Sequence, residues 1–162
     1  MNNLPIEKKS DEYWMRQALV LAQQAADNNE VPVGAVLVKN NEIIGRGCNQ
    51  PISSCDPTAH AEIQALRDAA NNINNYRLND SILYVTLEPC GMCAGAMIHS
   101  RIERVVYGAL EPKAGVVVSQ AQQFDQPYLN HKVAYTGGIC ANDCSQIISH
   151  FFARRRKEKA EK

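Results

Sequence analysis

The pattern of apolar and polar residues predicts a helix near the start of the chain and a pair of strands after it. Between Ser10, a favourable helix cap, and about Asn28, apolar residues recur at helical spacing. They form two adjacent stripes: Trp14, Ala18, Leu21 and Ala25, beside Met15, Leu19, Ala22 and Ala26. Residues 33–39 and 42–48 then have the composition of strands, and Asn40-Asn41 between them suits a hairpin turn.

Further along the chain, helices and strands are expected to alternate. Four more strand segments are predicted: 82–87, 104–109, 116–118 and 131–136. The first is a continuous apolar run, which suits a buried central strand. Helices are expected from a cap at Thr58 and from Pro89 in a first turn to about Ser100, and a last one follows Gly137-Gly138 and runs into ARRRKEK. This alternation predicts a three-layer α/β domain.

Length and composition favour a single globular domain. The chain has 162 residues, of which 45% are hydrophobic and 21% are charged. No apolar run approaches the roughly 20 residues of a membrane span, so no membrane partner is expected. The start, MNNLPIEKKSDEYW, lacks the apolar core of a signal peptide, which predicts a cytoplasmic protein. Six cysteines in that compartment favour metal binding or catalysis over a disulfide framework.

Charge is unevenly distributed, although the formal net charge is zero. From His150 to the C-terminus, six Lys or Arg residues and two Glu residues leave +4, so the other 149 residues carry −4. The six are Arg154, Arg155, Arg156, Lys157, Lys159 and Lys162. Such a basic end could contact an anionic partner such as nucleic acid. Charge alone favours the simpler interpretation, a solvated helix end whose cations complement the helix dipole.

Three residues form a candidate metal site. Cys90 and Cys93 make a C-x-x-C at a predicted helix start, where the spacing lets both sulfurs bind one ion. Alone, this pair also fits a redox-active dithiol or two corners of a structural zinc site, which Cys140 and Cys144 could complete. His60, at another predicted helix start, supplies a third nitrogen or sulfur ligand.

Glu62 changes the balance between these interpretations. Three protein ligands leave the fourth position of a zinc ion to water or hydroxide, which is typical of catalytic zinc. Glu62 lies two residues after His60, so in a first helical turn both side chains can enter one pocket. A carboxylate there can carry the proton of the water to the substrate. A four-cysteine structural site would leave the His60/Glu62 pair unexplained.

The combined pattern H-x-E followed by P-C-x-x-C is the signature of zinc-dependent deaminases. Several segments around it resemble the tRNA-specific adenosine deaminases of bacteria, over about Asp11 to Arg156: EYWMRQAL, EVPVGAVLV, DPTAHAEIQALR, NYRL, LYVTLEPCGMCAGAMIHSRI and RVVYGA. The resemblance implies a cytidine-deaminase-like α/β/α fold with a central five-stranded mixed sheet. It also implies hydrolysis of the wobble adenosine of an anticodon to inosine, by homodimers with one zinc in each subunit.

Residues 1–162 are expected to form a single zinc deaminase domain, with a core of about 11–152 and a basic helix end at 153–162, and the resemblance assigns roles residue by residue. His60, Cys90 and Cys93 match the zinc ligands, and Glu62 matches the proton shuttle. Three more residues match substrate contacts: Asn49 to the target base, Asn130 near the substrate, and Phe152 to the anticodon loop. Without the resemblance, these would be a turn residue, a loop residue and a core aromatic.

The chain departs from the family after RVVYGA. The family commonly has an aspartate two residues past the alanine, where this chain has Glu111, followed by Pro112. We hypothesise that Glu111 contacts the sugar of the target nucleotide or of its neighbour. Two other functions are open: a deaminase of a free base or nucleoside (guanine or cytosine type), and a non-catalytic, zinc-stabilised RNA-binding module, for which Glu62 would be dispensable.

Overall fold

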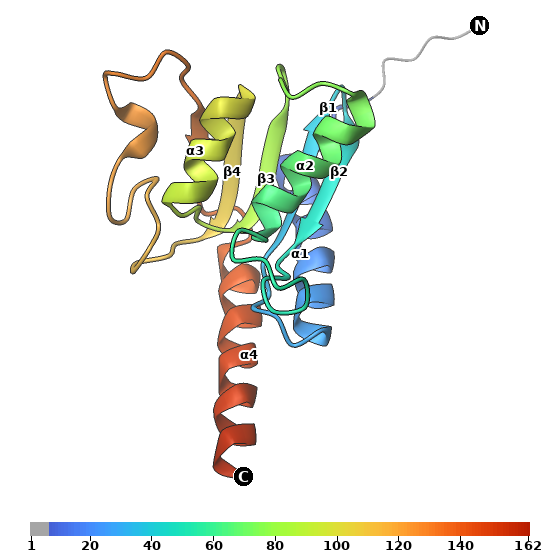
Figure 1. Ribbon diagram of the computed structural model, residues 1–162, viewed down its shortest axis with the longest axis vertical. Helices are drawn as coiled ribbons and strands as arrows, with labels where there is room; N and C mark the ends of the chain where they lie inside the picture. The colour runs from blue at the N-terminus through green and yellow to red at the C-terminus, as the bar shows by residue number, and fades with distance from the viewer. Residues whose placement is uncertain (1–6) are drawn as a thin grey trace, which may run out of the picture.

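The computed structural model describes residues 7–162 and contains a five-stranded mixed sheet with the strand order β2-β1-β3-β4-β5 (Figure 1). In chain order, the elements are α1 (Asp11–Asp27), β1 (Gly34–Lys39), β2 (Glu42–Cys48), α2 (Ala61–Ile73), β3 (Ile82–Leu87), α3 (Gly91–Ser100), β4 (Arg104–Ala109), the short 3₁₀ helix η1 (Gln123–Asp125), β5 (Ala134–Thr136) and α4 (Ala141–Ala160). β1 runs antiparallel to β2 and β3, whereas β4 runs parallel to β3 and β5. The expected five-stranded mixed sheet is confirmed.

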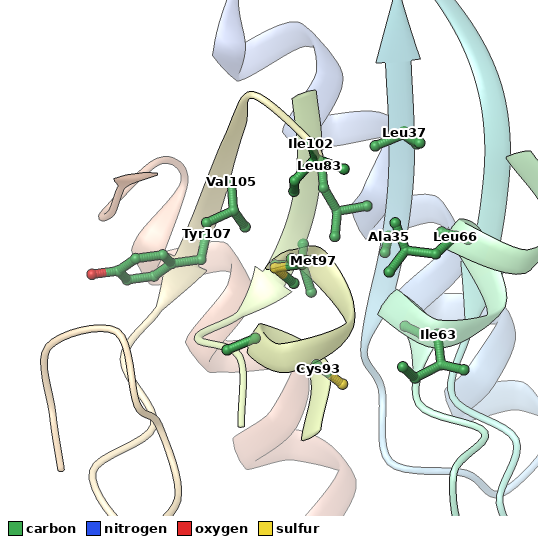
Figure 2. Packing of buried hydrophobic residues seen from close by; sticks show 14 of the residues in the cluster. Ala35, Leu37, Ile63, Leu66, Leu83, Cys93, Met97, Ile102, Val105 and Tyr107 are labelled. Carbon is green, nitrogen blue, oxygen red and sulfur yellow. The ribbon is translucent and has the colours of Figure 1, made fainter. Parts of the chain in front are cut away.

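Helices cover both faces of this sheet because alternate residues of its central strands point in opposite directions. On one face, residues such as Leu83, Val85 and Val105 pack under α2 and α3. Figure 2 shows this layer, with Met97 of α3 and Leu66 of α2 directed toward the strands. On the other face, the neighbouring strand residues pack against α1 and α4: Val36, Val38, Tyr84 and Val106. The predicted three-layer architecture is confirmed.

The first elements form where the sequence places them. The hydroxyl of Ser10 accepts a hydrogen bond from the Tyr13 amide at 3.1 Å and caps α1. Asn40 and Asn41 have φ angles of 51° and 60°, the left-handed values that a tight two-residue hairpin turn needs. Lys39 therefore pairs with Glu42 as β1 turns into β2.

Both helices that carry candidate ligands start later than the sequence predicts. Thr58 does not cap α2, because its hydroxyl donates to the carboxylate of Asp56 at 2.7 Å; the capping position is His60. Pro89 does not lie in the first turn of α3, because the helix starts at Gly91 with Cys90 in the capping position. The carbonyl of Pro89 instead accepts the amide hydrogen of Val116 at 3.0 Å.

Two predicted strand segments differ in the structure. Residues 116–118 form turns rather than extending the sheet, because the amides of Val117 and Val118 donate to a carboxylate and not to a strand. Residues 131–136 contribute only β5, which spans three residues. Within residues 7–162, no helix combines the length and apolarity needed to cross a membrane. The cytoplasmic location stays a prediction.

α4 extends well beyond the sheet, and the chain ends at its far tip (Figure 1). It leaves the sheet beside the C-terminal end of β4, where the amide of Gly138 donates to the carbonyl of Gly108 at 3.2 Å. The N-terminal ends of α2 and α3 lie at this same end of the sheet (Figure 1). The basic segment therefore projects from the end of the molecule that carries the candidate ligands.

Candidate active site

The starts of α2 and α3 bring the three candidate ligands together. Nδ1 of His60 lies 3.6 Å from the sulfur of Cys90 and 3.5 Å from the sulfur of Cys93. His60 and Cys90 occupy the capping positions of their helices, while Cys93 lies in the first turn of α3 and is buried. In Figure 2, the sulfur of Cys93 is directed toward the side of α2.

These donor atoms fit a zinc ion. Zinc–nitrogen bonds of about 2.0 Å and zinc–sulfur bonds of about 2.3 Å, meeting at the tetrahedral angle, place nitrogen and sulfur about 3.5 Å apart. The two nitrogen–sulfur distances match this value, and all three donor atoms lie within 4.8 Å of one another. In the described part of the chain, no other His, Cys, Asp or Glu residues form such a group.

Cys140 and Cys144, the other two cysteines considered as possible ligands, do not reach this site. Cys93 packs in the layer between the sheet and α2/α3, whereas Cys144 packs in the layer on the opposite face. The sheet thus separates the two C-terminal cysteines from Cys90 and Cys93, and a four-cysteine zinc site is excluded. All six cysteines are free thiols.

The surroundings of Cys90 favour its thiolate form. A hydrogen bond from the Cys93 thiol, helped by the nearby His60 ring, lowers the pKa of Cys90 to about 3. The same contact and burial raise the pKa of Cys93 above its ordinary value. Because a thiolate is the form that binds a metal, this lowered pKa suits Cys90 to act as a metal ligand.

Glu62 lies in the first turn of α2 and is only 4% exposed. Removal from water raises the pKa of its carboxyl group above the ordinary glutamate value. A carboxyl group with a raised pKa holds a proton more readily, which suits it to take up and release protons during a reaction. The expectation that His60 and Glu62 enter one pocket is met, because both line the same small cavity.

That cavity has a volume of about 190 Å³ and opens next to the donor atoms. Val31, Val33 and Leu87 provide apolar wall, while polar groups of Asn49 and Glu111 also face it. Pockets for drug-sized ligands typically measure about 300–1,000 Å³. The cavity therefore suits a single base, with the remainder of a larger substrate outside it.

Comparison with known proteins places the chain in a family. Residues 8–109 match the family model described as the cytidine and deoxycytidylate deaminase zinc-binding region. Over 160 residues, the chain is 52% identical to the tRNA-specific adenosine deaminase of Haemophilus influenzae, covering 98% of this chain and 92% of that protein. The chain belongs to the tRNA-specific adenosine deaminase family.

Solved structures agree with this membership of the tRNA-specific adenosine deaminase family. One, from a study of A-to-I editing by tRNA:A34 deaminases at the wobble position, is 42% identical with a TM-score of 0.81 and covers 83% of this chain and 98% of that one. A guanine deaminase from Bacillus subtilis is 32% identical with a TM-score of 0.62, covering 91% and 95%. The fold is thus shared with a free-base deaminase, at lower similarity.

Asn49 has a second role that the sequence did not indicate. Its side-chain oxygen accepts the amide hydrogen of Ala61 at 3.0 Å, so it caps α2 in place of Thr58. This bond fixes the orientation of the amide group and leaves its nitrogen as the free donor. Because Asn49 also lines the cavity, the residue that holds the start of α2 can contact a ligand as well.

The other predicted substrate contacts of this family member are not all at the cavity. Glu111 lines it, and its carboxylate also accepts the amide hydrogen of Lys113 at 3.0 Å. Asn130 is an exposed loop residue, and Phe152 on α4 is 43% exposed; neither lines the cavity. Phe152 is thus not the core aromatic of the simpler interpretation; that position belongs to the neighbouring Phe151.

Sequence analysis missed Glu88, another carboxylate that lines the cavity. It is 2% exposed and accepts hydrogen bonds from four backbone amides and one hydroxyl between residues 111 and 119. These bonds lower its pKa although burial acts in the opposite direction. The only sequence signal was a charged residue at the end of the apolar run 82–87, directly before Pro89 and Cys90.

Proposed function

We propose that this chain converts adenosine to inosine at the wobble position of a tRNA anticodon. The observation that carries the proposal is the convergence of His60, Cys90 and Cys93 beside buried Glu62 in one base-sized cavity. The names of the similar proteins supply the substrate class, because the relative at 52% identity is a tRNA-specific adenosine deaminase.

The proposed cofactor is one zinc ion in each chain, held by His60, Cys90 and Cys93, with a water as fourth ligand. Zinc bound in this way acidifies its water and so supplies the nucleophile near neutral pH. The zinc-binding description of the matching family supports the choice of metal. The nitrogen–sulfur distances near 3.5 Å support the ligand set.

In the proposed reaction, Glu62 moves the protons. Its carboxylate takes one proton from the attacking water and delivers it to N1 of adenine as the bond between C6 and oxygen forms. Glu62 would then take the remaining proton of the hydroxyl group added at C6 and transfer it to the amino group, which leaves as ammonia when the bond between C6 and nitrogen breaks and the C6 carbonyl forms. Burial of Glu62 supports this role, because its raised pKa suits both uptake and release.

Four further residues are proposed to hold the substrate. The free amide nitrogen of Asn49 would donate to the target base, and Glu111 would accept from the sugar of the target nucleotide or its neighbour. Asn130 and Phe152 would contact parts of the anticodon loop outside the cavity. An unpaired loop nucleotide suits a cavity that admits one base, because little energy is needed to turn it out of the stack.

The assembly and the cellular location are also proposals. A homodimer is implied by the resemblance of the sequence to its family. An exposed, mainly apolar groove between α2 and α3, lined by residues such as Ile63, Leu66 and Tyr76, is a candidate contact for the second copy. Sedimentation of the purified chain tests this assembly. The tRNA substrate in turn implies that the chain works in the cytoplasm.

A free-base deaminase is the second candidate, because a guanine deaminase shares the fold at 32% identity and the cavity would admit a free base. The deciding experiment supplies zinc-loaded protein with an anticodon stem-loop carrying adenosine at the wobble position, and separately with guanine, cytosine and cytidine. We expect ammonia release from the stem-loop alone. Release from a free base or nucleoside at a comparable kcat/KM would reject the tRNA assignment.

A further inference from the structure

Glu88 directly follows β3 and precedes Pro89 and Cys90 in the chain, and its buried side chain lines the cavity. Its carboxylate accepts amide hydrogens from Glu111 at 3.1 Å and from the segment that follows. The remaining donors are the amides of Val117, Val118 and Ser119, at 3.1, 3.0 and 3.0 Å, and the Ser119 hydroxyl.

One buried carboxylate thus organises a loop that has no strand or helix of its own. Residues 110–122 contain only turns and bends, and the bonds to the carboxylate add to local backbone bonds such as that from the Gly115 amide to the Glu111 carbonyl at 2.9 Å. Gly115 shows how closely the loop is fitted around the carboxylate. A Cβ atom at Gly115 would lie 2.4 Å from Cδ of Glu88, so any side chain there would displace one of the two.

This loop forms one wall of the cavity through Glu111 and Ala114. Because Glu88 binds the backbone of Glu111 directly, it sets where the Glu111 side chain stands relative to the target nucleotide. We propose that Glu88 is a positioning residue for substrate, acting through Glu111 and not through the metal ligands. The inference rests on the proposed function, because it concerns how that substrate is held.

Glu30 provides a matched control within the same chain. It is also a 2% exposed carboxylate, and it organises another loop by accepting the amides of Ile52 and Ser53 at 3.1 and 2.9 Å. Neither of those two residues lines the cavity. Glu30→Gln therefore disturbs a buried carboxylate of the same kind without touching the loop that carries Glu111.

The experiment compares wild type, Glu88→Gln and Glu30→Gln as zinc-loaded proteins on the anticodon stem-loop, at a temperature where all are folded. Glu88→Gln should keep full zinc content and raise KM by about 10-fold, the size of one lost charge-assisted hydrogen bond, with a smaller change in kcat. Glu30→Gln should lower the melting temperature but leave KM near the wild-type value. Gly115→Ala, which crowds the same carboxylate, should raise KM in the same direction.

A double-mutant cycle tests the route of the effect. If Glu88 acts through Glu111, adding Glu88→Gln to Glu111→Ala should raise KM by less than about 2-fold. Full additivity, loss of zinc from Glu88→Gln, or equal KM values for Glu88→Gln and Glu30→Gln would each overturn the inference. An inactive wild type would instead overturn the proposed function. Amide hydrogen exchange distinguishes failure of the inference from failure of the proposed function. Glu88→Gln should accelerate exchange at residues 111 and 117–119 even if the chain does not act on tRNA.

Discussion

The buried centre of this molecule and its proposed, exposed contacts to RNA are built in different ways. The centre comes from two short motifs whose helix starts hold His60 and Cys90 within 3.6 Å of each other. The proposed outer contacts, Asn130, Phe152 and the basic end of α4, are exposed and do not line the cavity. Chemistry thus depends on a few fixed atoms, whereas recognition of a large substrate is spread over the surface.

This difference predicts how strongly substitutions in the two regions should reduce activity. A change at the centre should abolish the reaction whatever the substrate, because every substrate would meet the same proposed proton carrier and metal ligands. A change at the periphery should produce a graded loss that depends on the length of the RNA and on salt.

The largest effect is expected for Glu62→Gln, which keeps the shape of the side chain but removes the proton carrier. General acid–base catalysis typically contributes about 100-fold to 10,000-fold, so kcat should fall by a factor in that range. Zinc content, measured on the purified variant, should stay at the wild-type level. Near-normal inosine formation by this variant would remove Glu62 from the mechanism and favour a non-catalytic RNA-binding module.

Cys90→Ala should lose zinc and activity together, and its melting temperature should fall, because a metal that ties the starts of α2 and α3 also stabilises the fold. Cys55→Ala is the matched control, since Cys55 is an exposed thiol outside the cavity. Metal analysis and thermal unfolding of both variants give the comparison. Full zinc occupancy in Cys90→Ala would show that Cys90 is not a ligand.

Glu111→Ala tests the boundary between the two regions. We expect kcat/KM on the stem-loop to fall by about 10-fold or more, the worth of one charge-assisted hydrogen bond, with zinc content and melting temperature unchanged. Wild-type kinetics would make Glu111 an ordinary loop carboxylate that only accepts the Lys113 amide. The correspondence with the aspartate of the family would then fail.

Neutralising the basic end of α4 should give a smaller loss that depends on salt. Arg154 donates to the carbonyl of Ala26 at 3.2 Å and so also ties α4 to α1, whereas within residues 7–162 Arg155 and Arg156 make no such bond. Replacing Arg155 and Arg156 by Gln should weaken tRNA binding and reduce the log–log salt slope by roughly 0.7 to 0.9 for each lost phosphate contact. An unchanged slope would support the simpler interpretation, in which the segment is a solvated helix end.

The smallest effect on activity is expected for Asp11→Asn, because Asp11 belongs neither to the buried centre nor to the proposed outer contacts. Its carboxylate accepts hydrogen bonds from Arg104 and from the hydroxyl of Tyr84, and the bond from Arg104 holds the pKa of Asp11 below its usual value. Because its pKa is lower in the folded state than in the unfolded chain, the Asp11 carboxylate stabilises the folded state at neutral pH. As pH falls below about 4, the carboxyl group of the unfolded chain takes up a proton first, and this stabilisation is lost. The difference in unfolding free energy between wild type and Asp11→Asn should therefore be constant near neutral pH and shrink below about pH 4, with kcat unchanged. A difference that grows toward acid pH would contradict this sign.

The sequence predicts the centre well because its chemistry is local. His60 and Glu62 form one short motif, and the C-x-x-C forms another, so both can be recognised within a few residues of sequence. The alternation of helices and strands then brings the two helix starts together. The failure at residues 116–118 has a clear physical cause: backbone amides there donate to a partner far away in the chain. Val116, Val117 and Val118 have the composition of a strand, yet the amides of the last two donate to Glu88, about thirty residues earlier.

Capping shows the same limit at closer range. Thr58 is a suitable cap by residue type, but its hydroxyl binds Asp56, and Asn49 satisfies the amide of Ala61 instead. No periodicity in the sequence encodes such a hydrogen bond between two separate segments of the chain. The position of Glu111 could not be predicted for a related reason, since it depends on the carboxylate of Glu88 and on the space left at Gly115.

The central claim, deamination of the wobble adenosine, is tested most directly by mapping inosine in total tRNA that lacks the modification. After incubation with the zinc-loaded chain, new inosine should occur at the first anticodon position of tRNAs that carry adenosine there, and Glu62→Gln should produce none. Absence of new inosine with the wild-type chain, or inosine scattered over other adenosines, would contradict the account.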